Sequence, residues 1–199
     1  MPLAVIILSY LVGAIPTGLV VVRVLAGEDI RRHGSGNIGT VNVFRVAGVA
    51  TAVVVLVVDI LKGIVPVLVA LRMGFAPWTV VLCGLASIIG HNWSVFLGFQ
   101  GGKGIATSFG VLLGLSWQAA AVAAAVWVIA VALTRYSSLG SLLAVVSVPI
   151  TFWRLRQPEE YMSLGVIVML LAIYRHRANI QRLVTGTELH ITDRAPLKK

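Results

Sequence analysis

Charged side chains are scarce in this 199-residue chain, and acidic side chains are the scarcest. Charged residues make up 12% of the chain, and only seven residues are Asp or Glu. An average soluble domain carries about 25% charged residues. Hydrophobic residues reach 58%, and the mean hydropathy is +0.97. A small soluble domain cannot cover that much apolar surface, because much of its surface stays exposed. We therefore interpret the chain as a polytopic membrane protein.

The residues that common catalytic centres require are also missing. Cys83 is the only cysteine, so an internal disulfide is excluded. The four histidines are far apart in sequence and acids are few, so we expect no metal and no cofactor. The nucleophile pattern Gly-x-Ser-x-Gly is absent, as is the His-x-x-x-x-Asp pattern of one acyltransferase class. An acyl-enzyme intermediate therefore has no obvious nucleophile, with Ser35 as the remaining candidate.

Long apolar segments set the expected architecture. A span needs roughly 20 apolar residues. The region 104–135 is too long for one helix and is predicted to divide near residues 114–116. The predicted spans are 3–22, 47–71, 76–97, two short helices within 104–135, 138–153 and 161–174. We predict one all-α membrane domain, 1–199, with about seven transmembrane helices. Five spans with re-entrant pieces are the alternative.

The cations predict the orientation of these spans. With seven spans and the N-terminus outside, twelve of the sixteen Lys and Arg residues lie in inner loops, Lys198 and Lys199 among them. Three lie in outer loops, and Lys62 lies within a span. Cytoplasmic loops are enriched in Lys and Arg, so we predict the N-terminus outside and the C-terminus inside. The net charge of +9 then reflects topology and an anionic ligand rather than nucleic acid.

Residues 34–39 read GSGNIG, which matches the dinucleotide-binding fingerprint, and Asp59 follows at a suitable distance. Asp59 falls inside the second predicted span, however, so no soluble βαβ unit surrounds it. The match is a coincidence of pattern. A charge within a span needs a partner, and Lys62, one helical turn later, is the expected one.

Polar residues gather in three segments, 31–45, 90–104 and 174–188, which the topology places on one membrane face. The first combines glycines, neutral donors and an arginine, as an anion-binding loop would. The second carries a lysine among glycines without the Walker A spacing. The third carries arginines with a histidine and an asparagine, and Arg175, Asn179 and Arg182 are expected along one helix face. Flexible loops and membrane anchors are the simpler alternative. A ligand with a phosphate head and a fatty tail suits all three segments.

In these segments the chain resembles the bacterial acyl-phosphate:glycerol-3-phosphate acyltransferase family, PlsY. The first motif is GSGNIGTVN (residues 34–42) with Arg45, and the second is GH (90–91) followed by GGKG (101–104). The third is RHR (175–177), followed by Asn179, Arg182, Gly186 and Glu188. Their order, the chain length and the number of spans match, so the resemblance covers essentially the whole chain. Val41, Ser94 and Gln100 depart from the family pattern, and we expect activity to survive these changes.

The resemblance implies an enzyme that moves an acyl chain from a fatty acyl phosphate to the first hydroxyl of glycerol 3-phosphate. Lysophosphatidic acid forms and orthophosphate leaves, as the first step of phospholipid synthesis. It implies a multi-pass protein of the bacterial plasma membrane whose active site faces the cytoplasm. The expected partners are the two substrates and the bilayer, with no nucleic acid and no obligate protein partner.

The residue patterns and the resemblance together predict the site. The predicted catalytic residues are Ser35, Arg45, His176 and Asn179. The predicted substrate-binding residues are Gly34, Gly36, Asn37, Gly39, Thr40, Asn42, His91, Gly101, Gly102, Lys103, Gly104, Arg135, Ser138, Ser141 and Glu188. A transporter for a phosphorylated metabolite is the rival class, since glycines and charges within spans suit it too. No internal repeat supports that reading, and the polar groups cluster at one face rather than at the midplane.

Overall fold

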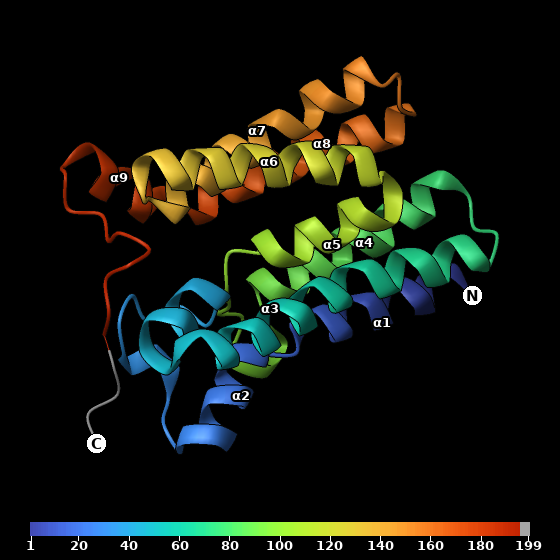
Figure 1. The fold of residues 1–199 in the computed structure, drawn as a ribbon. Coiled ribbons are helices and arrows are strands. Elements are labelled where there is room, and N and C mark those ends of the chain that lie inside the picture. Colours follow the sequence, from blue (N-terminus) through green and yellow to red (C-terminus); the bar gives the residue numbers. More distant parts are fainter. Residues whose placement is uncertain (196–199) are drawn as a thin grey trace.

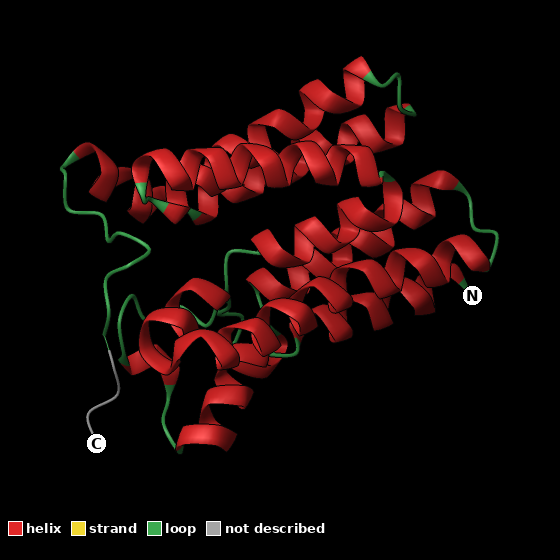
Figure 2. Cartoon of the chain, in the orientation of Figure 1, coloured by secondary structure: helices red, strands yellow, loops and turns green. Residues whose placement is uncertain are grey.

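Every regular element in residues 1–195, which the computed structural model describes, is a helix (Figure 2). The α-helices are α1 (Pro2–Ala14), α2 (Thr17–Ala26), α3 (Thr40–Arg72), α4 (Pro77–Asn92), α5 (Ile105–Leu115), α6 (Trp117–Thr134), α7 (Ser137–Arg154), α8 (Glu159–Arg175) and α9 (Arg177–Val184). Two short 3₁₀ turns, Ile30–Arg32 and Val95–Leu97, lie in the loops. The all-helical prediction is confirmed. Lys198 and Lys199, which were counted among the inner cations, lie outside the described residues.

A helix is present wherever a span was predicted. Four helical segments are long and apolar enough to cross a membrane, namely Pro2–Ala26, α3, α6 and α7, and α5 is a shorter apolar helix. The division of the 104–135 region is confirmed, because Ser116 is extended (φ −156°) between α5 and α6. The number of crossings and the direction of the termini stay predictions.

Helices α1 and α8 end earlier than the sequence predicted. The segment 3–22 is not one helix, since α1 stops before Ile15 and α2 starts after Pro16. Proline lacks an N–H and disfavours helical backbone at the residue before it. Arg175 and Asn179 do not share a helix face either, because α8 ends at Arg175 and α9 begins anew after His176.

The helices form two groups that face each other (Figure 1). One group contains α1, α3, α4 and α5, with α1 packed on α4 and α3 packed on α5. The other contains α6, α7 and α8, in which α7 contacts both neighbours. Close approach within the first group depends on glycine. A methyl group at Gly63 would overlap the Thr107 carbonyl, and one at Gly110 would overlap that of Ile60. Small residues at helix contacts are typical of membrane bundles.

The three polar segments lie at the same end of the bundle, as the sequence analysis predicted (Figure 1). The loop before α3, the loop before α5 and the α8–α9 junction meet there, together with the turn between α6 and α7. The N-terminus lies at the opposite end.

Candidate active site

A cavity of about 500 Å³ opens at this end, between the two helix groups. Such a volume is usual for a small-molecule site. Its deeper walls are apolar and come from α3, α5, α6, α7 and α8. The predicted site residues that line it are Ser35, Asn37, Gly39, Thr40, Asn42, Arg45, His91, Lys103, Gly104, Ser138, Ser141, His176, Asn179 and Glu188. The fold therefore brings together residues up to 153 positions apart in sequence, from Ser35 to Glu188.

Five predicted residues lie outside the lining of the cavity. Among the described residues, Gly34, Gly36, Gly101, Gly102 and Arg135 do not line the cavity. The Arg135 side chain is exposed, and its carbonyl accepts a hydrogen bond from the Ile191 N–H (2.8 Å). Arg135 ends α6 in the left-handed conformation (φ 62°), so its backbone shapes the turn before α7.

Asn42 organises the first loop. Its Oδ1 accepts the Ser35 N–H at 2.8 Å, and its Nδ2 donates to the carbonyls of His33 (3.0 Å) and Asn37 (2.8 Å). Gly34 has positive φ (57°), and its Cα faces the Asn42 amide so closely that a side chain would overlap it. The Asn42 amide is thus engaged within the protein. Ser35, in contrast, stands at the exposed rim of the cavity.

Three helices begin at the cavity. Thr40 starts α3, Ile105 starts α5 and Ser137 starts α7, and each of these residues lines the cavity. The first N–H groups of a helix have no partner within it, and the helix dipole adds partial positive charge there. Helix N-termini therefore favour anions. The hydroxyl of Thr40 is buried and has no hydrogen-bond partner in the described part of the chain, so it is available to a ligand.

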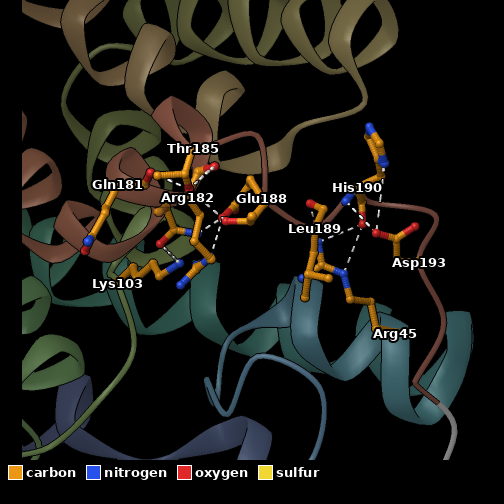
Figure 3. A network of polar contacts seen from close by, with 11 residues as sticks. Arg45, Lys103, Gln181, Arg182, Thr185, Glu188, Leu189, His190 and Asp193 are labelled. Atoms are coloured by element: carbon orange, nitrogen blue, oxygen red, sulfur yellow. Dashed lines mark hydrogen bonds and ion pairs between the residues drawn. The ribbon is translucent and has the colours of Figure 1, made fainter.

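A chain of polar contacts links Lys103 to the third segment (Figure 3). Lys103 Nζ donates to Asn179 Oδ1 (2.6 Å), and Asn179 Nδ2 donates to Glu188 Oε1 (2.6 Å). Arg182 Nε donates to the other oxygen, Oε2, at 2.7 Å. Glu188 thereby orients Asn179, and through it the ammonium group. The asparagine and the two cations face the cavity together.

Burial and neighbouring charges shift the pKa values of Lys103 and Glu188. Burial first, and then the cations Arg182, Arg45 and Arg175, lower the pKa of Lys103 to about 8 against the opposing effect of the Glu188 carboxylate. Burial also tends to raise the pKa of Glu188. Hydrogen bonds from Asn179 and Arg182 outweigh that tendency, so the pKa of this carboxyl lies below its usual value. At neutral pH the Lys103 side chain is therefore a charged ammonium group, and the Glu188 side chain is a charged carboxylate.

Arg45 holds the C-terminal segment across the mouth of the cavity. Its Nη2 donates to the carbonyls of Leu189 (3.1 Å) and His190 (2.8 Å), and its Nε also reaches His190 (3.2 Å). The Ala195 N–H donates to the Arg45 carbonyl (3.1 Å), and the His190 ring stacks on Tyr136 at 4.6 Å. Figure 3 shows the guanidinium turned toward this segment. Arg45 is therefore a structural clamp as well as a cation at the cavity wall.

His176 lies in the break between α8 and α9. Its Nδ1 is 2.8 Å from the Ala172 carbonyl, so Nδ1 carries the hydrogen and Nε2 is left as an acceptor. Burial, first, and the nearby Lys103 lower the pKa of His176 to about 4. The imidazole is therefore neutral at pH 7, and it lines the cavity.

Several residues of the cavity were not predicted from the sequence. Ser108 and Ser137 line it but belong to no glycine-rich or basic pattern, and Arg182 was not included in the predicted site. The position of Ser137 at a helix start was the one signal that sequence offered. Asp59 also reaches the cavity, and its predicted ion pair with Lys62 is confirmed, with Oδ1 and Nζ 2.8 Å apart. The described residues contain no group of three or more His, Cys, Asp or Glu side chains placed for a metal ion.

Comparison with known proteins identifies the family. The family model described as glycerol-3-phosphate acyltransferase matches residues 3–186. The glycerol-3-phosphate acyltransferase of Desulforudis audaxviator is 51% identical over 181 residues, which cover 91% of each chain. That of Geobacter sulfurreducens is 46% identical, over 90% of this chain and 92% of its own.

Two solved structures of PlsY, an integral membrane glycerol 3-phosphate acyltransferase, share the fold. The glycerol 3-phosphate form has a TM-score of 0.91 and 39% identity, and covers 95% of this chain and 94% of its own. The lysophosphatidic acid form has a TM-score of 0.89 and 37% identity over the same shares. The resemblance in the three polar motifs is thereby confirmed over nearly the whole length. The chain belongs to the glycerol-3-phosphate acyltransferase family of integral membrane proteins.

Proposed function

We propose that this protein transfers a fatty acyl group from an acyl phosphate to the sn-1 hydroxyl of glycerol 3-phosphate. The products are lysophosphatidic acid and orthophosphate. One observation carries the proposal: a single cavity joins a mouth of cations and helix N-termini to a long apolar wall. That combination suits a phosphate head on a fatty tail. The two similar PlsY structures, described as glycerol 3-phosphate and lysophosphatidic acid forms, support the acceptor and the product.

The phosphate of glycerol 3-phosphate is assigned to Lys103 and the start of α5. Lys103 supplies the positive charge, and Gly104 and Ile105 supply backbone N–H groups at the N-terminus of α5. Arg182 is a second cation, on the same side of Glu188 as Lys103 (Figure 3). Charge-assisted hydrogen bonds to phosphate are about twice as strong as neutral ones. In this assignment the glycine–lysine loop, residues 101–104, binds a phosphate group that is not part of a nucleotide.

The acyl phosphate is assigned to the first loop and the apolar wall. Ser35 and Asn37, with the N-terminus of α3, surround its phosphate and carbonyl, and Arg45 adds a fixed positive charge. Its tail lies along Leu56 and Phe109, toward Trp127 and Val148, and these residues line the cavity.

The reaction needs an oriented hydroxyl more than it needs a nucleophilic side chain. An acyl phosphate is a mixed anhydride and is already activated. The acceptor oxygen attacks the carbonyl carbon, an ester C–O bond forms, and the C–O bond to phosphate breaks. Orientation of the two reactants alone is worth several powers of ten in rate. The Ser35 hydroxyl and the first N–H groups of α3 are the donors assigned to the oxyanion.

The proton of the hydroxyl is assigned to the departing phosphate. A base whose conjugate acid has a pKa of about 4, as His176 has, accepts a proton weakly at pH 7. A phosphate group loses its second proton near pH 6, so it is the stronger base. Neutral His176 instead accepts a hydrogen bond at Nε2 and orients the attacking hydroxyl.

In this proposal the chain forms one domain over residues 1–199, and it works as a multi-pass protein of the bacterial plasma membrane with its cavity toward the cytoplasm. It catalyses the first step of phospholipid synthesis there. It needs no cofactor, binds no nucleic acid and requires no obligate protein partner. The excess of cations in the loops at the cavity end supports this orientation.

The decisive experiment uses the purified protein in detergent with glycerol 3-phosphate and palmitoyl phosphate. Orthophosphate and lysophosphatidic acid should appear in equal amounts, and palmitoyl coenzyme A should not replace the donor. Lys103→Ala should lower the rate of formation of both products about 10- to 150-fold at subsaturating glycerol 3-phosphate, whereas Arg23→Ala should leave that rate unchanged. Arg23 is an exposed cation of α2 that does not line the cavity. Product formation from the coenzyme A ester alone would refute the donor assignment.

A further inference from the structure

A buried cluster of charges lies behind the glycine–lysine loop, between α3 and α4. The side chains of Asp59, Lys62 and His91 are 2%, 4% and 5% exposed. Lys62 Nζ is 2.8 Å from Asp59 Oδ1 and donates to the Ile15 carbonyl at 3.0 Å. Charges are costly to bury in a membrane protein, and those that persist there usually serve the site they face. Asp59 and His91 both reach the cavity wall.

The Asp59 carboxylate also faces the His91 ring. His91 Nδ1 lies 3.9 Å from Asp59 Oδ1, too far for a direct hydrogen bond but close enough for the charge to orient the ring. Nδ1 has no hydrogen-bond partner in the described part of the chain. The nearby carboxylate favours the tautomer with a hydrogen on Nδ1. The ring orientation therefore depends on Asp59.

The opposite edge of the His91 ring supports the glycine–lysine loop. A methyl group at Gly102 would overlap His91 Nε2, so the loop backbone rests directly on the ring. The Gly102 N–H donates to the His91 carbonyl at 3.0 Å. From the other side, Arg175 Nη2 donates to the carbonyls of Gly101 (2.8 Å) and Gly102 (2.7 Å). The backbone immediately before Lys103 is thus held between His91 and Arg175.

We propose that Asp59 is a positioning residue for glycerol 3-phosphate binding. Its carboxylate holds the His91 ring under Gly102, and the ring sets the place of Lys103 and the first N–H groups of α5. The inference rests on the proposed function, because it assumes that this loop binds the acceptor phosphate. Neither Asp59 nor Lys62 belongs to the three polar segments. A ring that turned away would leave space beneath Gly102, and the loop would lose its support.

A simpler role for Asp59 is to neutralise Lys62. Two charge-free double variants separate the two roles. Asp59→Leu/Lys62→Met removes both charges and the acceptor that faces His91. Asp59→Asn/Lys62→Met also removes both charges but keeps an oxygen toward His91. Replacing a buried ion pair by apolar residues of similar size is often neutral for folding, so both variants are expected to fold.

The control variant is Ser87→Ala, at the same helix interface. Ser87 is fully buried in α4, and its hydroxyl donates to the Lys62 carbonyl at 2.5 Å. It perturbs the contact between α3 and α4 without touching the carboxylate, the imidazole or the loop. Its melting temperature should fall while its affinity for glycerol 3-phosphate stays that of the wild type.

The measurement is the dissociation constant of glycerol 3-phosphate, from calorimetry on the purified full-length protein in detergent. We expect a tenfold or larger increase for Asp59→Leu/Lys62→Met and a smaller one for Asp59→Asn/Lys62→Met. The KM for the acyl phosphate should change less than twofold. If the leucine variant binds within twofold of the wild type, Asp59 only neutralises Lys62 and the inference is wrong. Wild-type protein that binds glycerol 3-phosphate without acyl transfer would refute the proposed reaction and leave the positioning role measurable. Wild-type protein that does not bind it would refute both.

Discussion

The ionisation of Lys103 provides the sharpest test of the site. Its Nζ donates to Asn179 at 2.6 Å inside the cavity, and burial lowers its pKa to about 8. The protonated form of Lys103 binds phosphate more tightly than the neutral form, which has lost its positive charge. With this pKa, about nine-tenths of the side chains are charged at pH 7 and about one-tenth at pH 9. The value of kcat/KM for glycerol 3-phosphate should therefore fall as the pH rises through 8.

The size of the effect follows from the interaction that is lost. A hydrogen bond to a charged group contributes about 1.5–3 kcal/mol, and each 1.4 kcal/mol is a factor of ten in affinity. Neutral Lys103 should thus bind the acceptor about 10- to 150-fold more weakly. Lys103→Ala should show a loss of this order at pH 7, with little further change up to pH 9.

Lys103→Arg is the matched variant, because an arginine stays charged throughout this range. Its activity at pH 7 is expected to be lower, since the larger guanidinium must fit beside Asn179. Its profile should nevertheless stay flat between pH 7 and 9. The assay measures initial rates of lysophosphatidic acid formation at subsaturating glycerol 3-phosphate. Enzyme-free samples at each pH correct for spontaneous hydrolysis of the acyl phosphate.

A wild-type profile that is flat from pH 7 to 9 would contradict the role of Lys103. A Lys103→Arg variant that loses activity in parallel with the wild type would contradict it too, because the titrating group would then lie elsewhere. The second ionisation of the substrate phosphate, near pH 6, is complete before this window and does not imitate the result.

Three further predictions concern stability, measured by thermal unfolding in detergent. Glu188→Gln should cost about 1.5–3 kcal/mol, because the hydrogen bond from Arg182 at 2.7 Å loses its charged acceptor; an unchanged melting temperature would contradict this. The pKa of His176 is lowered to about 4, chiefly by burial, so the unfolded chain binds a proton below pH 6.5 that the folded chain takes up only near pH 4. Stability should therefore fall by about 3 kcal/mol between pH 6.5 and 4, and His176→Gln should remove that dependence. Ser116→Ala should cost about 1 kcal/mol, because the Ser116 hydroxyl accepts the Ala119 N–H at the start of α6; a variant as stable as the wild type would show that this cap is not needed.

The sequence alone was enough for the class of the protein, for its helical segments and for most of the candidate residues that the fold brings to the cavity. Hydropathy and helix length determine these properties locally, because a chain in a bilayer must satisfy its backbone hydrogen bonds within each helix. The break at Ser116 and the Asp59–Lys62 pair were also local, since each depends on residues within a turn or two. The motif residues were recognisable because lysine, arginine, histidine and asparagine are unusual among apolar spans.

The tertiary structure decided how the site residues work. Asn42 was predicted to bind substrate, and the fold engages its amide in holding the loop around Ser35. Arg45 was predicted as a catalytic residue, and its guanidinium also donates to backbone carbonyls 144 and 145 residues away. The shifts in the pKa of Lys103 and of His176 arise from burial by helices distant in sequence. The contact between the His91 ring and the glycine–lysine loop also depends on this packing of distant segments. Which group each side chain meets depends on how the two helix groups pack, and no local pattern carries that information.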